Sequence, residues 1–378
     1  MCDLRSDGGG SLASIEIGLA LSGGGSRAIA FHLGCLRGLH ERGVLQKISV
    51  ISAVSGGAVI AGMYAYSNDE FEEFDCRVVS LLRRGLNWST ARHLLSPSLL
   101  TRVLFTNLVA RPTAGFARLL RRQPPLRRWA SRTDALEKAL KDLFQDAHLE
   151  NVQRPNLDIV FNACEMRTAT AFRFGNRHTG TWRFGEIVGN NISVAHAVAC
   201  SAAYPMLLPA FDREYEFLKN GATQSHRVII SDGGAYDNLG TSCLEPGRDN
   251  AFSLHTYPAD YIICCYAGHG QLTGDSIPFG FVSRVQSAFE SVFRKLQDAT
   301  LQRLHMYKRA NMIKGFILPY LGQQDEALPI RPPDLVRRDE IVGYPTNFAA
   351  MSANNLDRLT RRGEQLTRIL LAHYCPEI

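Results

Sequence analysis

The 378-residue sequence has no stretch of 18 or more uninterrupted apolar residues, and this argues against a membrane-spanning helix. The nearest candidate, residues 192–210, contains serine, histidine and two prolines. The first ten residues, MCDLRSDGGG, also lack the apolar run that forms the core of a signal peptide. We therefore expect a flexible leader over residues 1–14 and a cytoplasmic protein.

Paired cysteines are absent as well. The nine cysteines are scattered and odd in number, and no two have C-x-x-C spacing. The sequence therefore suggests neither a disulfide framework nor a thiolate zinc site, and a reducing compartment is expected. We predict no metal and no cofactor. Internal repeats and low-complexity tracts are missing too, which argues against a solenoid or a fibrous protein.

Residues of both charge signs and apolar residues are present in ordinary amounts. With 45% apolar residues the chain can bury the core of one enzyme-sized α/β domain with additions. The net charge of +6 and the isoelectric point near 8.9 fit an anionic membrane surface, a nucleic acid or neither. The charge alone does not identify a function.

The N-terminal part of the chain follows a strand–helix–strand–helix pattern. Residues 15–21 and 48–54 are apolar or β-branched runs, and apolar residues recur at helical spacing over 28–42 and 58–66. Such a unit predicts two neighbouring parallel strands joined by a right-handed crossover. The turns that follow the two strands then lie at one carboxyl edge of the sheet, where ligand sites form in α/β proteins.

Further elements follow along the chain. A helix is expected to start with a capping box at Asp134 and Glu137, and a long helix is expected from Phe279 to about Lys308. The phenylalanines of this long helix have core spacing, which predicts packing; a groove for a lipid chain is the alternative. A last helix is expected near the C-terminus. Further strands are expected at 156–163, 170–174, 227–230 and 261–266.

Residues 99–132 contain eight arginines and no acidic residue, together with Phe105, Phe116, Trp129 and many leucines. Arginines beside aromatic and leucine side chains are typical of helices that bind anionic lipid at a membrane surface. A solvated charged face is the alternative. No recognised nucleic-acid module accompanies the arginines, so we do not expect nucleic acid as a partner.

Three short motifs suggest chemistry. Ser55, in Ala-Val-Ser-Gly-Gly, lies between a predicted buried strand and a helix, as does the serine of a nucleophile elbow. Gly57 provides the small residue that supports such a turn, whereas Ala53 replaces the first glycine of the usual G-x-S-x-G pattern. Taken alone, the motif fits an ordinary tight turn equally well.

A glycine-rich loop follows the first predicted strand. Gly23, Gly24 and Gly25, followed by Ser26 and Arg27, leave backbone N–H groups unobstructed near a helix N-terminus, and this suits an oxyanion. The loop lacks the lysine and the spacing of a phosphate-binding loop and does not fit G-x-G-x-x-G. A plain glycine-rich turn is the remaining alternative.

The third motif is Asp232, which follows the predicted strand 227–230 and precedes two glycines. A carboxylate at the end of a buried strand can accept a proton from a serine hydroxyl. Its ordinary pKa near 3.9 makes aspartate a weak base at neutral pH, so burial would have to raise the pKa. An Asp-Gly turn without chemistry is the alternative.

Together and in this order, the three motifs resemble those of the patatin-like phospholipases. The block Cys200–Pro205 resembles that family as well, with cysteine where alanine or serine is usual. The resemblance is close over 18–66, 201–205 and 229–239, and looser over 156–174 and near 344–347.

The resemblance implies a Ser55–Asp232 catalytic dyad and an oxyanion hole formed by Gly23, Gly24, Gly25 and Arg27, with no metal. It implies a lipid acyl hydrolase acting on carboxylic esters, of phospholipase A or lysophospholipase type. Arg27 is expected to brace the loop or to steer an anionic head group.

Two alternatives stay open. A Ser-His-Asp esterase would use His255 or His269, which both follow Asp232, although classical α/β-hydrolases have no GGGSR loop one strand before the elbow. A non-catalytic module that binds lipid or protein would explain Ala53 and the basic segment.

The expected fold is a three-layer α/β/α sandwich with a mainly parallel central sheet and helical additions. The catalytic domain would span residues 15–275, with a basic helical insertion at about 90–150, and a C-terminal helical extension over 276–378 would pack on it. We expect a lipid ester as substrate and peripheral membrane contact through residues 99–132. The exact lipid and the oligomeric state are left open by the sequence.

Overall fold

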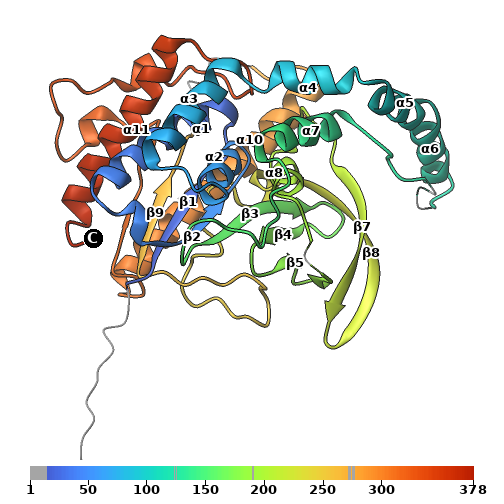
Figure 1. Cartoon of the computed structure of the whole chain (residues 1–378), viewed down its shortest axis with the longest axis horizontal. Helices are drawn as coiled ribbons and strands as arrows, with labels where there is room; N and C mark the ends of the chain where they lie inside the picture. The colour runs from blue at the N-terminus through green and yellow to red at the C-terminus, as the bar shows by residue number, and fades with distance from the viewer. Residues whose placement is uncertain (1–14, 123, 125, 190, 271–273, 275–276) are drawn as a thin grey trace, which may run out of the picture.

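A ten-stranded sheet lies at the centre of the molecule (Figure 1). The structure is a computed structural model, and it describes residues 15–122, 124, 126–189, 191–270, 274 and 277–378. The strand order is β10-β9-β1-β2-β3-β4-β5-β6-β7-β8. The strands are β1 (Ile17–Leu21), β2 (Ile48–Ala53), β3 (Asp158–Glu165), β4 (Thr170–Gly175), β5 (Thr179–Thr181), β6 (Gly185–Ile187), β7 (Phe211–Lys219), β8 (Ala222–Asp232), β9 (Tyr261–Cys265) and β10 (Gly315–Ile317).

Two kinds of strand pairing meet at β3. The strands β10, β9, β1, β2 and β3 are parallel, whereas those from β4 to β8 pair antiparallel with their neighbours. The end of β3 also pairs with the end of β8, with Ala163 opposite Asp232. The antiparallel strands therefore form a closed ring that begins and ends at β3.

Helices cover both faces of the parallel strands. On one face, α1, α2, α3, α8 and α11 pack with the sheet into one large apolar core. The other face is covered by α10 and by the segment after α9. The helices are α1 (Gly25–Glu41), α2 (Gly56–Ala65), α3 (Phe71–Arg84), α4 (Asn87–Leu94), α5 (Pro97–Phe105), α6 (Arg111–Leu119), α7 (Arg132–Phe144), α8 (Val194–Ser201), α9 (Gly234–Asp237), α10 (Phe281–Arg309) and α11 (Ala353–Tyr374).

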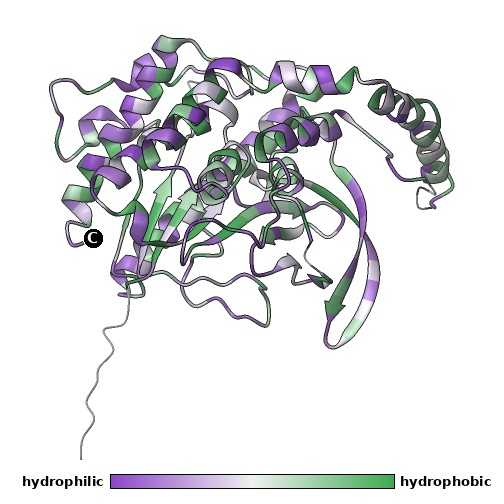
Figure 2. Ribbon diagram, in the orientation of Figure 1, coloured by the Kyte–Doolittle hydropathy of each residue, from purple (hydrophilic) through white to green (hydrophobic). Residues whose placement is uncertain are grey.

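The central strands are apolar on both sides because both sides are covered. All five residues of β1 and all five of β9 are buried, and these strands are green at the centre of Figure 2. Successive side chains alternate between the two cores, so Cys264 faces α10 whereas Cys265 faces α1. The predicted three-layer α/β/α sandwich is confirmed, with a parallel centre and an antiparallel addition.

Two expectations about helices are wrong in detail. Helix α7 begins at Arg132, and its N-cap is Ser131, whose hydroxyl accepts a hydrogen bond from Thr133 N–H. Asp134 is the third helical residue and closes the capping box with Ser131. The N-terminal half of α10 does not pack into the core, since Phe281 and Val282 are exposed. The buried residues of this helix all lie in its C-terminal half, and they are Gln297, Thr300 and Leu304.

The basic segment forms helices that extend away from the central strands. Figure 1 shows α5 and α6 at the right of the view, joined by a π-helical turn at Thr106–Ala110. No helix among the described residues is long and apolar enough to cross a membrane.

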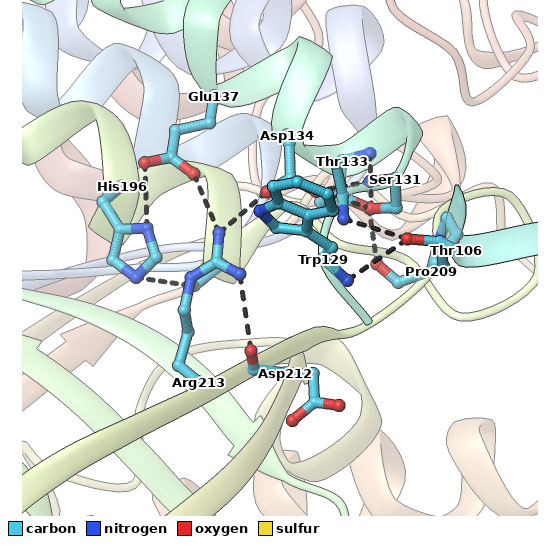
Figure 3. A network of polar contacts seen from close by, with 12 residues as sticks. Thr106, Trp129, Ser131, Thr133, Asp134, Glu137, His196, Pro209, Asp212 and Arg213 are labelled. Carbon is cyan, nitrogen blue, oxygen red and sulfur yellow. Dashed lines mark hydrogen bonds and ion pairs between the residues drawn. The ribbon is translucent and has the colours of Figure 1, made fainter. Parts of the chain in front are cut away.

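Hydrogen bonds hold the middle and the end of this segment together, and an ion pair ties α7 to β7 (Figure 3). The Thr106 hydroxyl accepts from the backbone N–H groups of Trp129 and Ala130, each at 3.2 Å. Arg213 of β7 pairs with Asp134 of α7 at 2.8 Å. The N–H of Arg128 donates to the Asp212 carboxylate of β7 at 3.0 Å, and this hydrogen bond ties the end of the segment to the main body.

Candidate active site

Ser55 occupies a sharp turn between β2 and α2. Its backbone has φ 52° and ψ −118°, a left-handed φ that is uncommon for a residue with a side chain. A Cβ added at Gly57 would overlap the carbonyl oxygens of Leu21 and Ser22, so only glycine fits beside the turn. The N–H of Ser55 donates to Ser201 Oγ at 2.9 Å. The surroundings thus hold Ser55 in the conformation that the elbow motif predicts.

The glycine-rich loop lies beside this turn and offers two free amides. Gly23 N–H donates to the Asn238 carbonyl at 3.1 Å, and Ser26 N–H donates to the Asn347 carbonyl at 2.7 Å. The described residues supply no acceptor for the N–H groups of Gly24 and Gly25. Of the three glycines expected at an oxyanion hole, Gly24 and Gly25 therefore have donors available, whereas the donor of Gly23 holds the loop in place.

Arg27 is buried and binds backbone and a histidine. Its Nε donates to the Ala267 carbonyl at 2.9 Å and Nη1 donates to the Tyr344 carbonyl at 3.1 Å. Nη1 also contacts the ring of His269. Burial lowers the pKa of Arg27 to about 10, so the guanidinium stays charged at neutral pH. These contacts fit the bracing role expected of Arg27 better than a direct role in the reaction.

Asp232 ends β8 and lies next to Ser55. The pairing of Ala53 with Phe161, and of Ala163 with Asp232, brings the ends of β2 and β8 close together along β3. Burial raises the pKa of Asp232 to about 7, against the lowering effect of hydrogen bonds from Gly234 N–H, at 2.7 Å, and from the Ser55 side chain. The carboxyl group can therefore take up a proton near neutral pH, as a general base must.

One cavity of about 410 Å³ contains all these groups. Ser55, Asp232, Gly24 and Gly25 line it together with apolar side chains and residues of α4 and α10. This volume lies within the usual range for small-molecule sites. The lining side chains from other segments include Leu136, Tyr204, Leu207, Leu208 and Phe348.

The histidines of the alternative triad do not reach Asp232. His255 is fully buried, its Nε2 bonds the His178 carbonyl at 2.8 Å, and burial lowers its pKa to about 3. His269 lines the cavity but contacts Arg27 and the Val342 carbonyl. Within the described residues, the geometry thus favours a Ser-Asp pair over a triad.

Two asparagines that were not among the predicted site residues also belong to the site. Asn238 lines the cavity, and its carbonyl holds Gly23. Asn347 comes from the C-terminal segment and its carbonyl holds Ser26. Both lie in stretches that resemble the family, but these roles were not predicted, because each acts through a backbone oxygen that only the tertiary fold brings to the loop.

The fold and the arrangement of these motifs agree with a comparison of sequence families. A family described as patatin-like phospholipase matches residues 19–242, which is more than half of the chain. The chain therefore belongs to the patatin-like phospholipase family.

Comparisons with individual proteins add fold information. No curated protein matches the sequence. The solved structure of human GIVD cytosolic phospholipase A2 is similar with a TM-score of 0.54 and 12% identity, over 94% of this chain and 59% of the human chain. VipD from Legionella pneumophila is similar with a TM-score of 0.41 and 15% identity, over 96% of this chain and 67% of VipD. The chain thus spans less than two thirds of the human enzyme.

Proposed function

We propose that this protein is a lipid acyl hydrolase that cleaves carboxylic esters through Ser55 and Asp232. The observation that carries the proposal is the meeting of three groups from distant segments in one cavity. These groups are a serine in a constrained turn, a buried carboxyl group whose pKa is about 7, and two free backbone amides.

The proposed reaction is a two-step acyl transfer. Ser55 Oγ attacks the ester carbonyl carbon while Asp232 accepts its proton. The N–H groups of Gly24 and Gly25 stabilise the oxyanion, and one such donor typically contributes about 3 kcal/mol to the transition state. When the ester C–O bond breaks, Asp232 returns the proton to the departing alkoxide. Water then attacks the acyl-serine with Asp232 again as the base, the C–O bond between the acyl group and Ser55 breaks, and Asp232 returns the proton to Ser55 Oγ.

Substitution of the two side chains tests the proposal. Release of fatty acid from phospholipid and from p-nitrophenyl esters is expected to fall by about 10⁴-fold or more in Ser55→Ala and in Asp232→Asn. Exposed residues of the same types provide matched controls, and Ser225→Ala and Asp146→Asn should retain full activity. Activity that survives in Ser55→Ala would refute the assignment.

A fluorophosphonate probe distinguishes the enzyme from a non-catalytic module. Stoichiometric labelling of Ser55 in the folded protein supports the hydrolase. A folded protein that binds lipid vesicles but is not labelled at Ser55 would instead support the binding module.

We also propose that the enzyme reaches its substrate at an anionic lipid surface. Helices α4 and α10 both line the cavity, and apolar side chains are exposed on or near each of them. Trp88 of α4 is 80% exposed, and Phe279, two residues before α10, is 92% exposed. Leu119 of α6, in the basic segment, is 80% exposed. The exposed arginines of the basic segment supply the complementary charge. Further exposed apolar residues are Leu95, Leu108, Phe116, Trp129, Ile277, Phe281 and Val282.

Charge neutralisation tests the membrane proposal. Replacing Arg118, Arg121 and Arg122, which are all exposed, with glutamine should weaken co-sedimentation with anionic vesicles at least tenfold, because each basic residue near the surface contributes about 1 kcal/mol. Hydrolysis of a soluble ester should not change. The matched control replaces three exposed arginines outside this segment, Arg42, Arg309 and Arg331, with glutamine. Equal weakening by both triple variants would contradict a localised surface.

A further inference from the structure

A buried cluster between α1 and β9 contains three metal-ligating side chains that the proposed reaction does not use. His32 and Cys35 are one turn apart on α1 and thus share a face of the helix, and Cys265 is the last residue of β9. A ring nitrogen of His32 and the two sulfur atoms all lie within 4.8 Å of one another. All three side chains are completely buried.

The hydrogen bonds of His32 leave one ring nitrogen without a partner. Nε2 lies 2.9 Å from the Ser22 carbonyl oxygen, which can only accept, so Nε2 carries the proton. Nδ1 then has a free lone pair, and it has no hydrogen-bond partner among the described residues. Histidines that bind metals commonly donate their other N–H to a backbone carbonyl in this way. The ring is therefore held in the tautomer that a metal ligand requires.

We propose that His32 Nδ1, Cys35 Sγ and Cys265 Sγ bind one zinc ion. Two thiolates and a neutral imidazole are a donor set that zinc prefers, and the two thiolate charges balance the charge of the ion in a buried site. Binding replaces the two thiol protons, which leave to solvent, and no oxidant or reductant is involved.

The site would be structural and would support the glycine-rich loop. Ser22, which accepts the hydrogen bond from His32, directly precedes Gly23, and its own N–H donates to the Cys265 carbonyl at 3.1 Å. Ala267 N–H donates to Ser22 Oγ at 2.9 Å. The ion would join α1 to β9 at the point where both hold the start of the loop. This proposal does not depend on the hydrolase activity.

Metal analysis of the full chain tests the proposal. After expression in zinc-supplemented medium, inductively coupled plasma mass spectrometry should find about one zinc per chain in the wild type and less than about one tenth in Cys35→Ser and Cys265→Ser. Cys264→Ser is the matched control, because Cys264 is equally buried but faces the other core. It should retain zinc.

A second measurement on the wild-type chain covers the case in which the serine variants do not fold. Refolding with cobalt(II) in place of zinc should give thiolate-to-cobalt charge-transfer absorption. Wild-type protein that takes up neither metal would overturn the proposal. So would mass spectrometry that finds Cys35 and Cys265 joined in a disulfide after zinc loading.

Discussion

Burial determines how Asp232 behaves as an acid and a base. An aspartate in water is ionised at pH 7 and holds a proton too weakly to take one from serine. The buried site disfavours the charged form and raises the pKa of Asp232 to about 7. Two hydrogen bonds to the ionised form limit this rise. The carboxyl group can then exchange a proton with a hydroxyl at the pH of a cell.

This pKa predicts a pH dependence. The base must be ionised to accept a proton, and a raised pKa makes the ionised form the minority below about pH 7. The value of kcat/KM for a soluble ester should therefore fall about tenfold per pH unit below pH 7 and level off above it. The rate of fluorophosphonate labelling of Ser55 should follow the same curve. A flat profile between pH 5 and pH 9 would contradict the role of Asp232.

The elements that could be predicted from the sequence are those with local signals. β1, β2 and α1 lie within a few residues of the expected bounds, because apolar runs broken by glycines mark them. β7 was not predicted, because Arg213 interrupts the apolar alternation of FDREYEFLK. The exposed start of α10 was not predicted either, because apolar spacing does not show whether a partner covers the helix.

The residues of the candidate site divide in the same way into those with a local sequence signal and those without one. Ser55, Asp232 and the glycine loop are local motifs, and the sequence pointed to them. Two other features depend on contacts between segments far apart in the chain. They are the hydrogen bond from Gly23 N–H to the Asn238 carbonyl and the proximity of His32 to Cys265. No spacing rule could have indicated them.

The N-cap of α7 provides a test of one element. Ser131 Oγ accepts from Thr133 N–H, and Asp134 accepts from Ser131 N–H at 2.6 Å. Ser131→Ala removes the cap and should lower the free energy of unfolding by about 1 kcal/mol. Urea unfolding followed by circular dichroism measures this change. Ser98→Ala in the basic segment is the control, because its side chain caps no helix, and a similar loss there would argue against the capping role.

The packing of α1 against α11 joins the two ends of the described chain. A Cβ at Gly34 would overlap the Thr360 carbonyl, and a Cβ at Gly363 would overlap the Phe31 carbonyl. The two helices can approach this closely only because both positions are glycine. We propose that residues 276–378 form an extension to a catalytic domain of residues 15–275, although the extension also supplies β10 to the sheet.

The close approach predicts a global effect of a small substitution. Gly34→Ala should push α1 and α11 apart and lower the free energy of unfolding by about 1–3 kcal/mol. Gly115→Ala in α6 is the matched control, since nothing lies near its added Cβ, and it should raise that free energy by up to about 1 kcal/mol. Thermal unfolding of both variants measures the difference. A Gly34→Ala protein as stable as the wild type would mean that α11 does not pack as described.

The pairing of β8 back onto β3 has a consequence for behaviour at high concentration. A strand with unpaired backbone groups can recruit a strand from another molecule, and this is a common start of aggregation. The ring is closed only where the last three residues of β8 pair with β3, so the rest of β8 has a partner strand on one edge only. At the other end of the sheet the outer strand is β10, which is only three residues long. So short a strand as β10 is a poor template, and association of concentrated protein through its sheet should begin instead at the open edge of β8.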